Sequence, residues 1–285
     1  MPRQLIITAD DYGFTPAINR GIEACVQAGT VKSICVMTNM PHWRSIKQIK
    51  KSHPDVSIGI HWTVSQGKPV LSRNNVSTLI TSDGYFLPPT QFRNRYRQGE
   101  IDLSELESEL GAQLAMLREE VQDIAYWNTH QNIHVSFGCF HDFVRIASKL
   151  GIQVMRNHFR FVAHTQKANW KVLLRNPLFG LKGVILYRWA KWARSNGMFM
   201  PAGIIANIGF GPGHTRLLDT LSVTTWQGIA EVAVHPADSI DGLEGATTLV
   251  TSRIKEYQLL SSESFVEQLL QQEIELVNFS AVCQQ

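Results

Sequence analysis

Two adjacent carboxylates, Asp10 and Asp11, follow the first apolar segment of the chain in the sequence ITADDYG. Neighbouring carboxylates repel each other, so a protein that keeps them together needs something that stabilises both charges. A bound divalent cation would do so, with one carboxylate as a metal ligand and the other as a base for a water activated by the metal. The alternative is a turn that caps the following helix, but Thr15 and Pro16 already supply that cap.

Three further apolar segments end in histidine. His61 ends SIGIH, His130 and His134 lie in NTHQNIH, and His235 ends VAVH. Imidazole and carboxylate groups are the usual ligands of zinc and other first-row divalent ions. A single histidine at the end of a strand is usually structural, whereas several of them together with two carboxylates favour a metal site. The other histidines show no such pattern: His42, His53, His141, His158, His164 and His214.

A scaffold that brings strand ends together must position these residues. Short apolar segments alternate along the chain with amphipathic ones, which predicts strands and helices in turn. This alternation predicts an α/β fold with a parallel sheet covered by helices, either open or closed into a barrel, with its chemistry at the carboxyl ends of the strands. Predicted strands cover 4–9, 31–38, 56–62, 124–128, 152–156 and 231–235, and predicted helices cover 17–29, 42–51, 103–121 and 141–151.

Two sequence signals indicate where helices begin. Thr15 followed by Pro16 is typical of the start of a helix, and Gly29 is expected to end that helix. Ser104 and Glu107 have the spacing of a capping box, which predicts the start of the helix at 103–121.

The composition is that of one large globular unit. The 285 residues are 44% hydrophobic, and no linker-like stretch interrupts them, so we expect a single domain over residues 1–285. The N-terminus lacks the features of a signal peptide, and no window approaches the ~20 apolar residues of a membrane span, so a soluble, cytoplasmic protein is expected. The four cysteines have no CxxC spacing and are expected to be buried, reduced thiols.

Four segments in order resemble the YdjC-like carbohydrate deacetylases, the group that contains chitooligosaccharide deacetylase and the hopanoid-biosynthesis-associated deacetylase. They are LIITADDYG, SIGIHWTVSQGKPV, THQNIHV and EVAVHPAD, and the resemblance runs from residue 3 to about residue 260. It implies a distorted (β/α) barrel similar to that of NodB-type polysaccharide deacetylases. The implied reaction is metal-dependent hydrolysis of an N-acetyl group from an amino sugar.

The resemblance also implies a role for each site residue. Asp11, His61 and His130 would bind one divalent metal ion, either zinc, magnesium or another first-row ion. Asp10 would be the general base, and His235 would be the acid that protonates the leaving amine. These roles suit an amide, which is a poor electrophile and must not expel an amide anion.

Three more residues are expected near the metal. His134 follows His130 at i,i+4, so it would support the metal or replace a ligand, and Arg156 follows a predicted strand and could reach the site. Asn128 occupies a position where many relatives have aspartate, and Gln131 and Asn132 replace histidines. A carboxylate bonded to a ligating histidine orients it and raises its basicity. Asn128 could still hold the ring, but we expect altered metal affinity or preference.

The distribution of charge is uneven. Residues 143–218 contain twelve lysines and arginines and no acid, so this segment is formally +12 and the rest of the chain −9, which sum to the total of +3. Within it, a basic apolar segment at about 157–200 includes NPLFGLKGVILYRWAKWARSNGMF. Such a mixture is typical of a helix on a membrane surface or of a solvated helix that covers a barrel, and both interpretations stay open. No nucleic-acid-binding module is present, so no such partner is expected.

Three functions are compatible with these patterns. The leading one is removal of acetyl from an N-acetylated sugar, free or lipid-linked, by a cytoplasmic enzyme that could lie at the inner face of the membrane. The second keeps the metal but cleaves a phosphoester or glycosidic bond. The third is a non-catalytic protein that binds a sugar or lipid. The oligomeric state, including a homodimer, stays open.

Overall fold

A parallel sheet forms the centre of the molecule. The computed structural model describes residues 3–136, 138–161, 177–205 and 217–284. The sheet has eight strands within these residues, and all their pairings are parallel. They are β1 (Arg3–Tyr12), β2 (Ser33–Val36), β3 (Ser57–Trp62), β4 (Ile124–Thr129), β5 (Arg160–Phe161), β6 (Gly203–Ile205), β7 (Ile229–Val234) and β8 (Ile274–Leu276).

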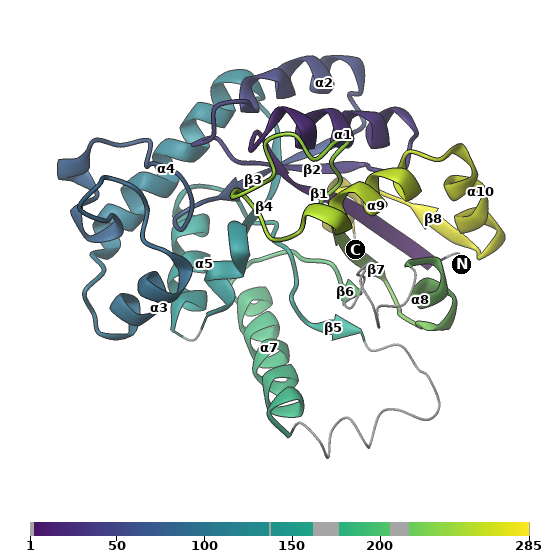
Figure 1. Ribbon diagram of the computed structural model, residues 1–285. Coiled ribbons are helices and arrows are strands. Elements are labelled where there is room, and N and C mark those ends of the chain that lie inside the picture. The colour runs from purple at the N-terminus through teal and green to yellow at the C-terminus, as the bar shows by residue number, and fades with distance from the viewer. Residues whose placement is uncertain (1–2, 137, 162–176, 206–216, 285) are drawn as a thin grey trace.

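The strands curve into a distorted barrel (Figure 1). Their order is β4-β3-β2-β1-β7-β6-β5, and β8 pairs with the first residues of β1. The segment after α5 lies beside β4, since Met155 forms a single bridge with Trp127 of β4 and Val154 forms another with Phe199, which precedes β6. The predicted fold class is therefore confirmed. The strand predicted at 152–156 is present only as these bridges, because the backbone leaves β4 again after Arg156.

Helices surround this sheet (Figure 1). Most lie in the connections between successive strands, as the alternation in the sequence predicts. They are α1 (Pro16–Gln27), α2 (Ile46–Ser52), α3 (Pro89–Arg97), α4 (Leu103–Glu120), α5 (Cys139–Lys149), α7 (Pro177–Ser195), α8 (Leu217–Val223), α9 (Val250–Leu260) and α10 (Glu263–Gln271). Within the described residues, no helix combines the length and the apolar character needed to cross a bilayer.

The two predicted helix starts have different outcomes. The hydroxyl of Thr15 accepts the N–H of Ile18 at 3.2 Å, with Pro16 at the first position of α1, so this cap is confirmed. The capping box of α4 is wrong. Asp102 caps that helix by accepting the N–H of Ser104 at 2.7 Å, and Glu107 instead pairs with Lys149. An aspartate two residues earlier thus supplies the cap that Ser104 was expected to make.

The cysteines are free, as expected. Cys25, Cys35 and Cys139 are buried, whereas Cys283 near the C-terminus is exposed. Four of the basic residues in the acid-free segment lie outside the described residues, namely Lys167, Lys171, Arg175 and Arg216, and so do His164 and His214.

Candidate metal and catalytic site

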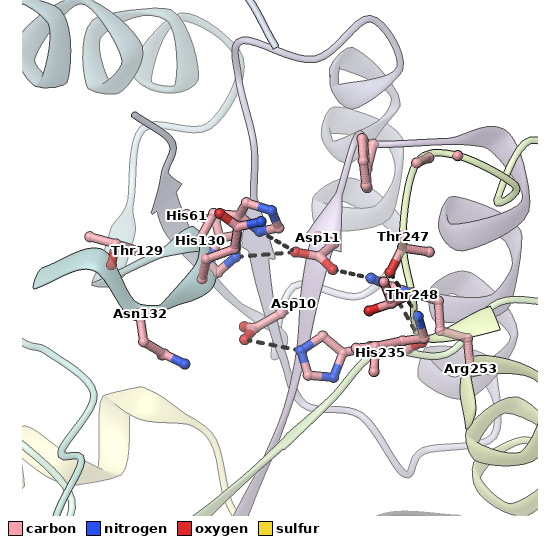
Figure 2. Close-up of a pocket in the computed structure, with 15 residues that line it drawn as sticks. Asp10, Asp11, His61, Thr129, His130, Asn132, His235, Thr247, Thr248 and Arg253 are labelled. Atoms are coloured by element: carbon pink, nitrogen blue, oxygen red, sulfur yellow. Dashed lines mark hydrogen bonds and ion pairs between the residues drawn. The ribbon is translucent and has the colours of Figure 1, made fainter. Parts of the chain in front are cut away.

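A bulge at the end of β1 turns both aspartates toward one pocket. In a regular strand, successive side chains point to opposite faces, so Asp10 and Asp11 would diverge. The register between β1 and β2 shifts between Ala9 and Tyr12, and Asp11 adopts a left-handed φ of 69°. A bulge of this kind redirects a side chain at the cost of backbone strain. Figure 2 shows the two carboxylates beside each other as a result.

The pocket lies at the carboxyl ends of the strands, where the fold predicts chemistry. Its volume is about 640 Å³. Asp10 and Asp11 come from β1 and His61 from β3, while His130 begins the short 3₁₀ helix η4 (His130–Val135) after β4. The remaining wall comes from His235 after β7, the loop at 245–249 and Arg253 of α9.

Asp11 lies between two histidines. Its Oδ1 is 3.2 Å from His61 Nε2 and 3.0 Å from His130 Nδ1. One ligand atom from each of the three residues lies within 4.8 Å of the others. One carboxylate oxygen and two imidazole nitrogens form a suitable donor set for a divalent ion. These residues therefore fit the metal that the family resemblance implies.

A second cluster of Asp10, Cys35 and His61 is also close enough to hold a metal. The Sγ of Cys35, however, donates to Asn128 Oδ1 at 2.7 Å. Burial, with Asp10 nearby, raises the pKa of this thiol well above its ordinary value. Because metals bind the thiolate, Cys35 in this environment is a poor ligand.

Arg253 binds the second oxygen of Asp11, a contact that no pattern in the sequence predicts. Its Nη2 donates to Asp11 Oδ2 at 2.5 Å, and both side chains are at most 3% exposed. Burial alone would raise the pKa of Asp11, but Arg253 and His130 outweigh it and hold that pKa well below its usual range. Arg253 also donates to the carbonyl of His235 at 3.3 Å. A buried arginine in a helix carries no local motif, so only the fold reveals it.

Asp10 has a different arginine as its partner. Arg156 donates to Asp10 through Nη1 at 2.6 Å and Nη2 at 2.9 Å, and through Nε to Glu231 at 2.8 Å. Burial raises the pKa of Asp10, but Arg156 and His61 together lower it to about 2. Arg156 thus contacts the carboxylate expected to act as the base, and this contact keeps Asp10 ionised at neutral pH.

Asn128 connects the two halves of the site. Its Oδ1 accepts a hydrogen bond from His61 Nδ1, and its Nδ2 donates to Asp10 Oδ1 at 3.2 Å. Since the amide oxygen can only accept, Nδ1 of His61 carries a proton, which leaves Nε2, the nitrogen that faces Asp11, as the one that could bind a metal. Asn128 thus holds the ring as an aspartate would, without placing another negative charge beside Asp10.

His235 faces Asp10 across the pocket (Figure 2). Its Nε2 is 3.9 Å from Asp10 Oδ2, and its side chain is 28% exposed. Its backbone N–H donates to the carboxylate of Glu256 in α9. Burial, despite the opposing effect of Asp11, lowers the pKa of His235 to about 4, so the imidazole is neutral at neutral pH.

His134 does not join this cluster of ligand atoms, so a direct metal contact gains no support, and its supporting role beside the metal stays a prediction. It is fully buried, its Nδ1 is 2.7 Å from the hydroxyl of Thr129, and its ring packs against Trp127 and His158. The i,i+4 argument assumed a regular α-helix. Residues 131 and 132 instead have left-handed φ values of 54° and 52°, which turn residue 134 away from residue 130.

The sequence profile described as YdjC-like protein matches residues 4–271. The chain belongs to the YdjC-like family. A carbohydrate deacetylase of Listeria monocytogenes serotype 4b is 26% identical over 282 residues, which cover 97% of this chain and 98% of that protein. The mouse carbohydrate deacetylase is 32% identical over 155 residues, 54% of this chain and half of its own length.

Among solved structures, a candidate cellobiose-phosphate cleavage protein from Enterococcus faecalis V583 superposes with a TM-score of 0.77. It is 21% identical, and the alignment covers 99% of each chain. At this identity the likeness shows that the two proteins share a fold. Together with the family match, the relatives named carbohydrate deacetylase confirm the predicted enzyme class, a YdjC-like hydrolase.

Proposed function

We propose that this YdjC-like protein is a single-domain, metal-dependent deacetylase that hydrolyses the N-acetyl group of an amino sugar. Asp11, His61 and His130 would hold one divalent ion. The observation that carries this proposal is the convergence of their ligand atoms within 4.8 Å, beside a second carboxylate that Arg156 holds apart. The names of the full-length relatives support a carbohydrate as the substrate.

The bound ion would polarise the amide carbonyl and lower the pKa of the attacking water. Asp10 is ionised and faces the pocket, so it can accept a proton from that water. Arg156 and Asn128 fix both of its oxygens, which limits the directions from which a proton can arrive.

In this proposal, His235 would complete the proton transfer. It is neutral at neutral pH and lies 3.9 Å from Asp10, so the proton that Asp10 removes from water has a short route to His235 Nε2. The resulting imidazolium can protonate the nitrogen of the departing amine. One proton is therefore taken from water and returned to the product, and both residues regain their starting state.

The outer part of the pocket suits an uncharged sugar. Phe14 offers an aromatic face, and Asn132, Thr247 and Thr248 offer an amide and two hydroxyls. Among the described lining residues, the only permanent cation is Arg253, which is paired with Asp11. No lining arginine or lysine in the described chain is thus left to bind a phosphate, which favours the deacetylase over the phosphoesterase alternative.

We further propose that the amino sugar belongs to a glycan or a glycolipid. A lipid-linked sugar would bring the enzyme to the inner face of a membrane, and α7 is the part of the described structure that fits such a surface.

Acetate release tests the proposed reaction. Protein stripped of metal with a chelator and then supplied with zinc, magnesium or cobalt would be incubated with a panel of N-acetylated oligosaccharides and glycolipids. We expect acetate and a free amine in equal amounts, only after metal is restored. Release of phosphate or of new reducing ends without acetate would contradict the proposal and indicate cleavage of a phosphoester or glycosidic bond. Tight sugar binding without any product would indicate a non-catalytic sugar-binding protein.

A further inference from the structure

One face of α7 fixes the helix to the rest of the protein. Leu186, Ala190 and Ala193 are buried. Trp189 stacks on Phe140 of α5, with ring centroids 5.0 Å apart and planes inclined by 12°. The inward face therefore accounts for part of the apolar character that the sequence shows in this segment.

The outward face of α7 also carries large apolar side chains, in its first half. Leu181, Val184 and Tyr187 are 57%, 55% and 56% exposed. Residues spaced by three lie on one side of a helix, so these three form a continuous apolar row. In Figure 1 this half of α7 extends below every other described element. An exposed apolar row at a protruding tip is typical of a contact surface.

Basic side chains occupy the same outward face in the second half of the helix. Arg188, Lys191 and Arg194 follow at the same spacing, and Lys182 flanks the apolar row. The helix contains no acidic residue. None of the salt bridges in the described chain involves these four cations. Arg194 does donate to the carbonyl of Pro201, so Lys182, Arg188 and Lys191 are the better probes of surface charge.

The order of the two halves matches the depth profile of an anionic bilayer. With a rise of 1.5 Å per residue, the apolar row and the cationic row each extend roughly 9 Å along the helix. Interfacial segments bury apolar side chains about 5–10 Å into the boundary between headgroups and acyl chains, where anionic headgroups attract cations. A nucleic acid or an acidic protein would need the cations but would gain nothing from an apolar tip.

We propose that α7 is a membrane-docking helix, with Leu181, Val184 and Tyr187 entering the interface and Arg188 and Lys191 binding anionic headgroups. This inference goes beyond the proposed reaction and does not rest on it, because lipid binding is measured without any substrate.

Vesicle flotation tests the docking surface. Wild-type protein would be mixed with vesicles of phosphatidylcholine alone or of phosphatidylcholine with phosphatidylglycerol, over a range of salt concentrations. We expect binding to the anionic vesicles only, weakening as salt rises, because salt screens charges at the surface.

Two variants and two matched controls separate charge from apolar contact. Replacing the three probe cations of α7 with glutamine should weaken binding by roughly 100-fold, given the usual contribution of a cation near an anionic surface. Replacing the three residues of the apolar row with serine should abolish flotation with the anionic vesicles, apart from weak electrostatic binding at low salt. The control variants alter three exposed cations or three exposed apolar residues elsewhere, and should bind as the wild type does. The charge control is Lys51, Arg73 and Arg97 to glutamine, and the apolar control is Val223, Leu103 and Leu270 to serine.

Circular dichroism and thermal unfolding curves that match those of the wild type would establish that each variant is folded. If folded wild-type protein fails to float with anionic vesicles, or if the controls lose as much binding as the α7 variants, the docking helix is refuted. Salt-sensitive binding to DNA that is equally strong with and without the apolar row would instead assign the surface to a polyanion.

Discussion

Asp10 and Asp11 are adjacent in the chain, yet different side chains bind the oxygens of the two carboxylates. Arg156 occupies both oxygens of Asp10 and also holds Glu231. Arg253 occupies one oxygen of Asp11 and leaves the other facing His61 and His130. The Asp10 side is thus a closed network of charges, whereas the Asp11 side keeps one oxygen available at a cluster of metal-binding groups.

This difference changes the explanation for the adjacent carboxylates. From the sequence, a bound cation was the reason to keep them together. In the structure, two buried arginines already balance the two charges, so the site can be assembled before any metal binds. Preassembly of this kind limits reorganisation during the reaction. The metal would then be needed for chemistry and not for folding.

The largest effect should follow from removing a ligand on the Asp11 side. His61→Ala is expected to abolish both stoichiometric metal binding and acetate release, because a site with two remaining ligands holds a divalent ion weakly. Metal content after dialysis, measured by mass spectrometry, checks this. His42→Ala, an exposed histidine outside the pocket, is the control and should keep both properties. Unchanged metal content in His61→Ala would eliminate the proposed ligand set.

The next effect separates the roles of the two acids. Asp10→Asn preserves size but removes the base, so turnover should fall on the order of 10² to 10⁴ fold while metal binding persists. Asp11→Asn should lose metal as well. Isothermal titration with zinc, run beside acetate assays, measures both quantities. The division of roles fails if the two variants lose metal to the same extent.

The strand-end residues of this site were predictable, because strand periodicity and parallel topology place Asp10, Asp11, His61, His130 and His235 at one edge. Two of their partners were not. Arg253 and Glu256 come from a helix that reaches the site only through tertiary packing, and no local pattern distinguishes a buried arginine from a solvated one. His134 shows the reverse case, since its apparent helical spacing was broken by two left-handed residues that sequence alone does not predict.

The network around Asp10 makes Arg156 more important for stability than Arg253. Arg156→Met leaves Asp10 and Glu231 buried without their cation, which should cost about 3–5 kcal/mol in the free energy of unfolding. Arg253→Met should cost less, because His61 and His130 can share the charge of Asp11. Denaturant unfolding compares them. The control is Arg20→Met, because Arg20 is 52% exposed and its ion pair with Asp238 is screened by water, so its loss should change stability little. Equal losses in the two buried variants would contradict the comparison.

Glu256 should make the stability of the protein depend on pH, by an amount similar to the cost of Arg156→Met. Burial raises the pKa of this carboxyl to about 7, although the N–H of His235 acts in the opposite direction. The folded protein therefore keeps a proton that the unfolded chain loses first, so stability should fall as pH rises from the unfolded value of 4.5 toward 7. The loss should approach ~3 kcal/mol relative to Glu256→Gln, which cannot titrate.

The stability that Asp10 contributes should change with pH in the opposite direction. Its pKa is lowered from 3.8 to about 2, so its contribution is complete above pH 4 and is lost as pH falls toward 2. Denaturation curves between pH 2 and pH 8 for wild type, Glu256→Gln and Asp10→Asn would resolve the two windows. Parallel profiles for wild type and Glu256→Gln between pH 5 and pH 7 would show that Glu256 is ionised in the folded state.

The smallest effect concerns Asn128, the residue that joins the two sides. Asn128→Ala removes the acceptor that fixes the tautomer of His61, and loss of such a partner typically lowers metal affinity by about 10–100-fold. Because its Nδ2 also binds Asp10, the variant should lower turnover further when metal is saturating. Thr248→Ala is the control, since Thr248 lines the same pocket without contacting His61 or Asp10 in any described hydrogen bond. Its metal affinity should match the wild type. If the two alanine variants bind metal equally well, His61 is oriented by packing and not by Asn128, and the replacement of the relatives' aspartate has no consequence for the metal.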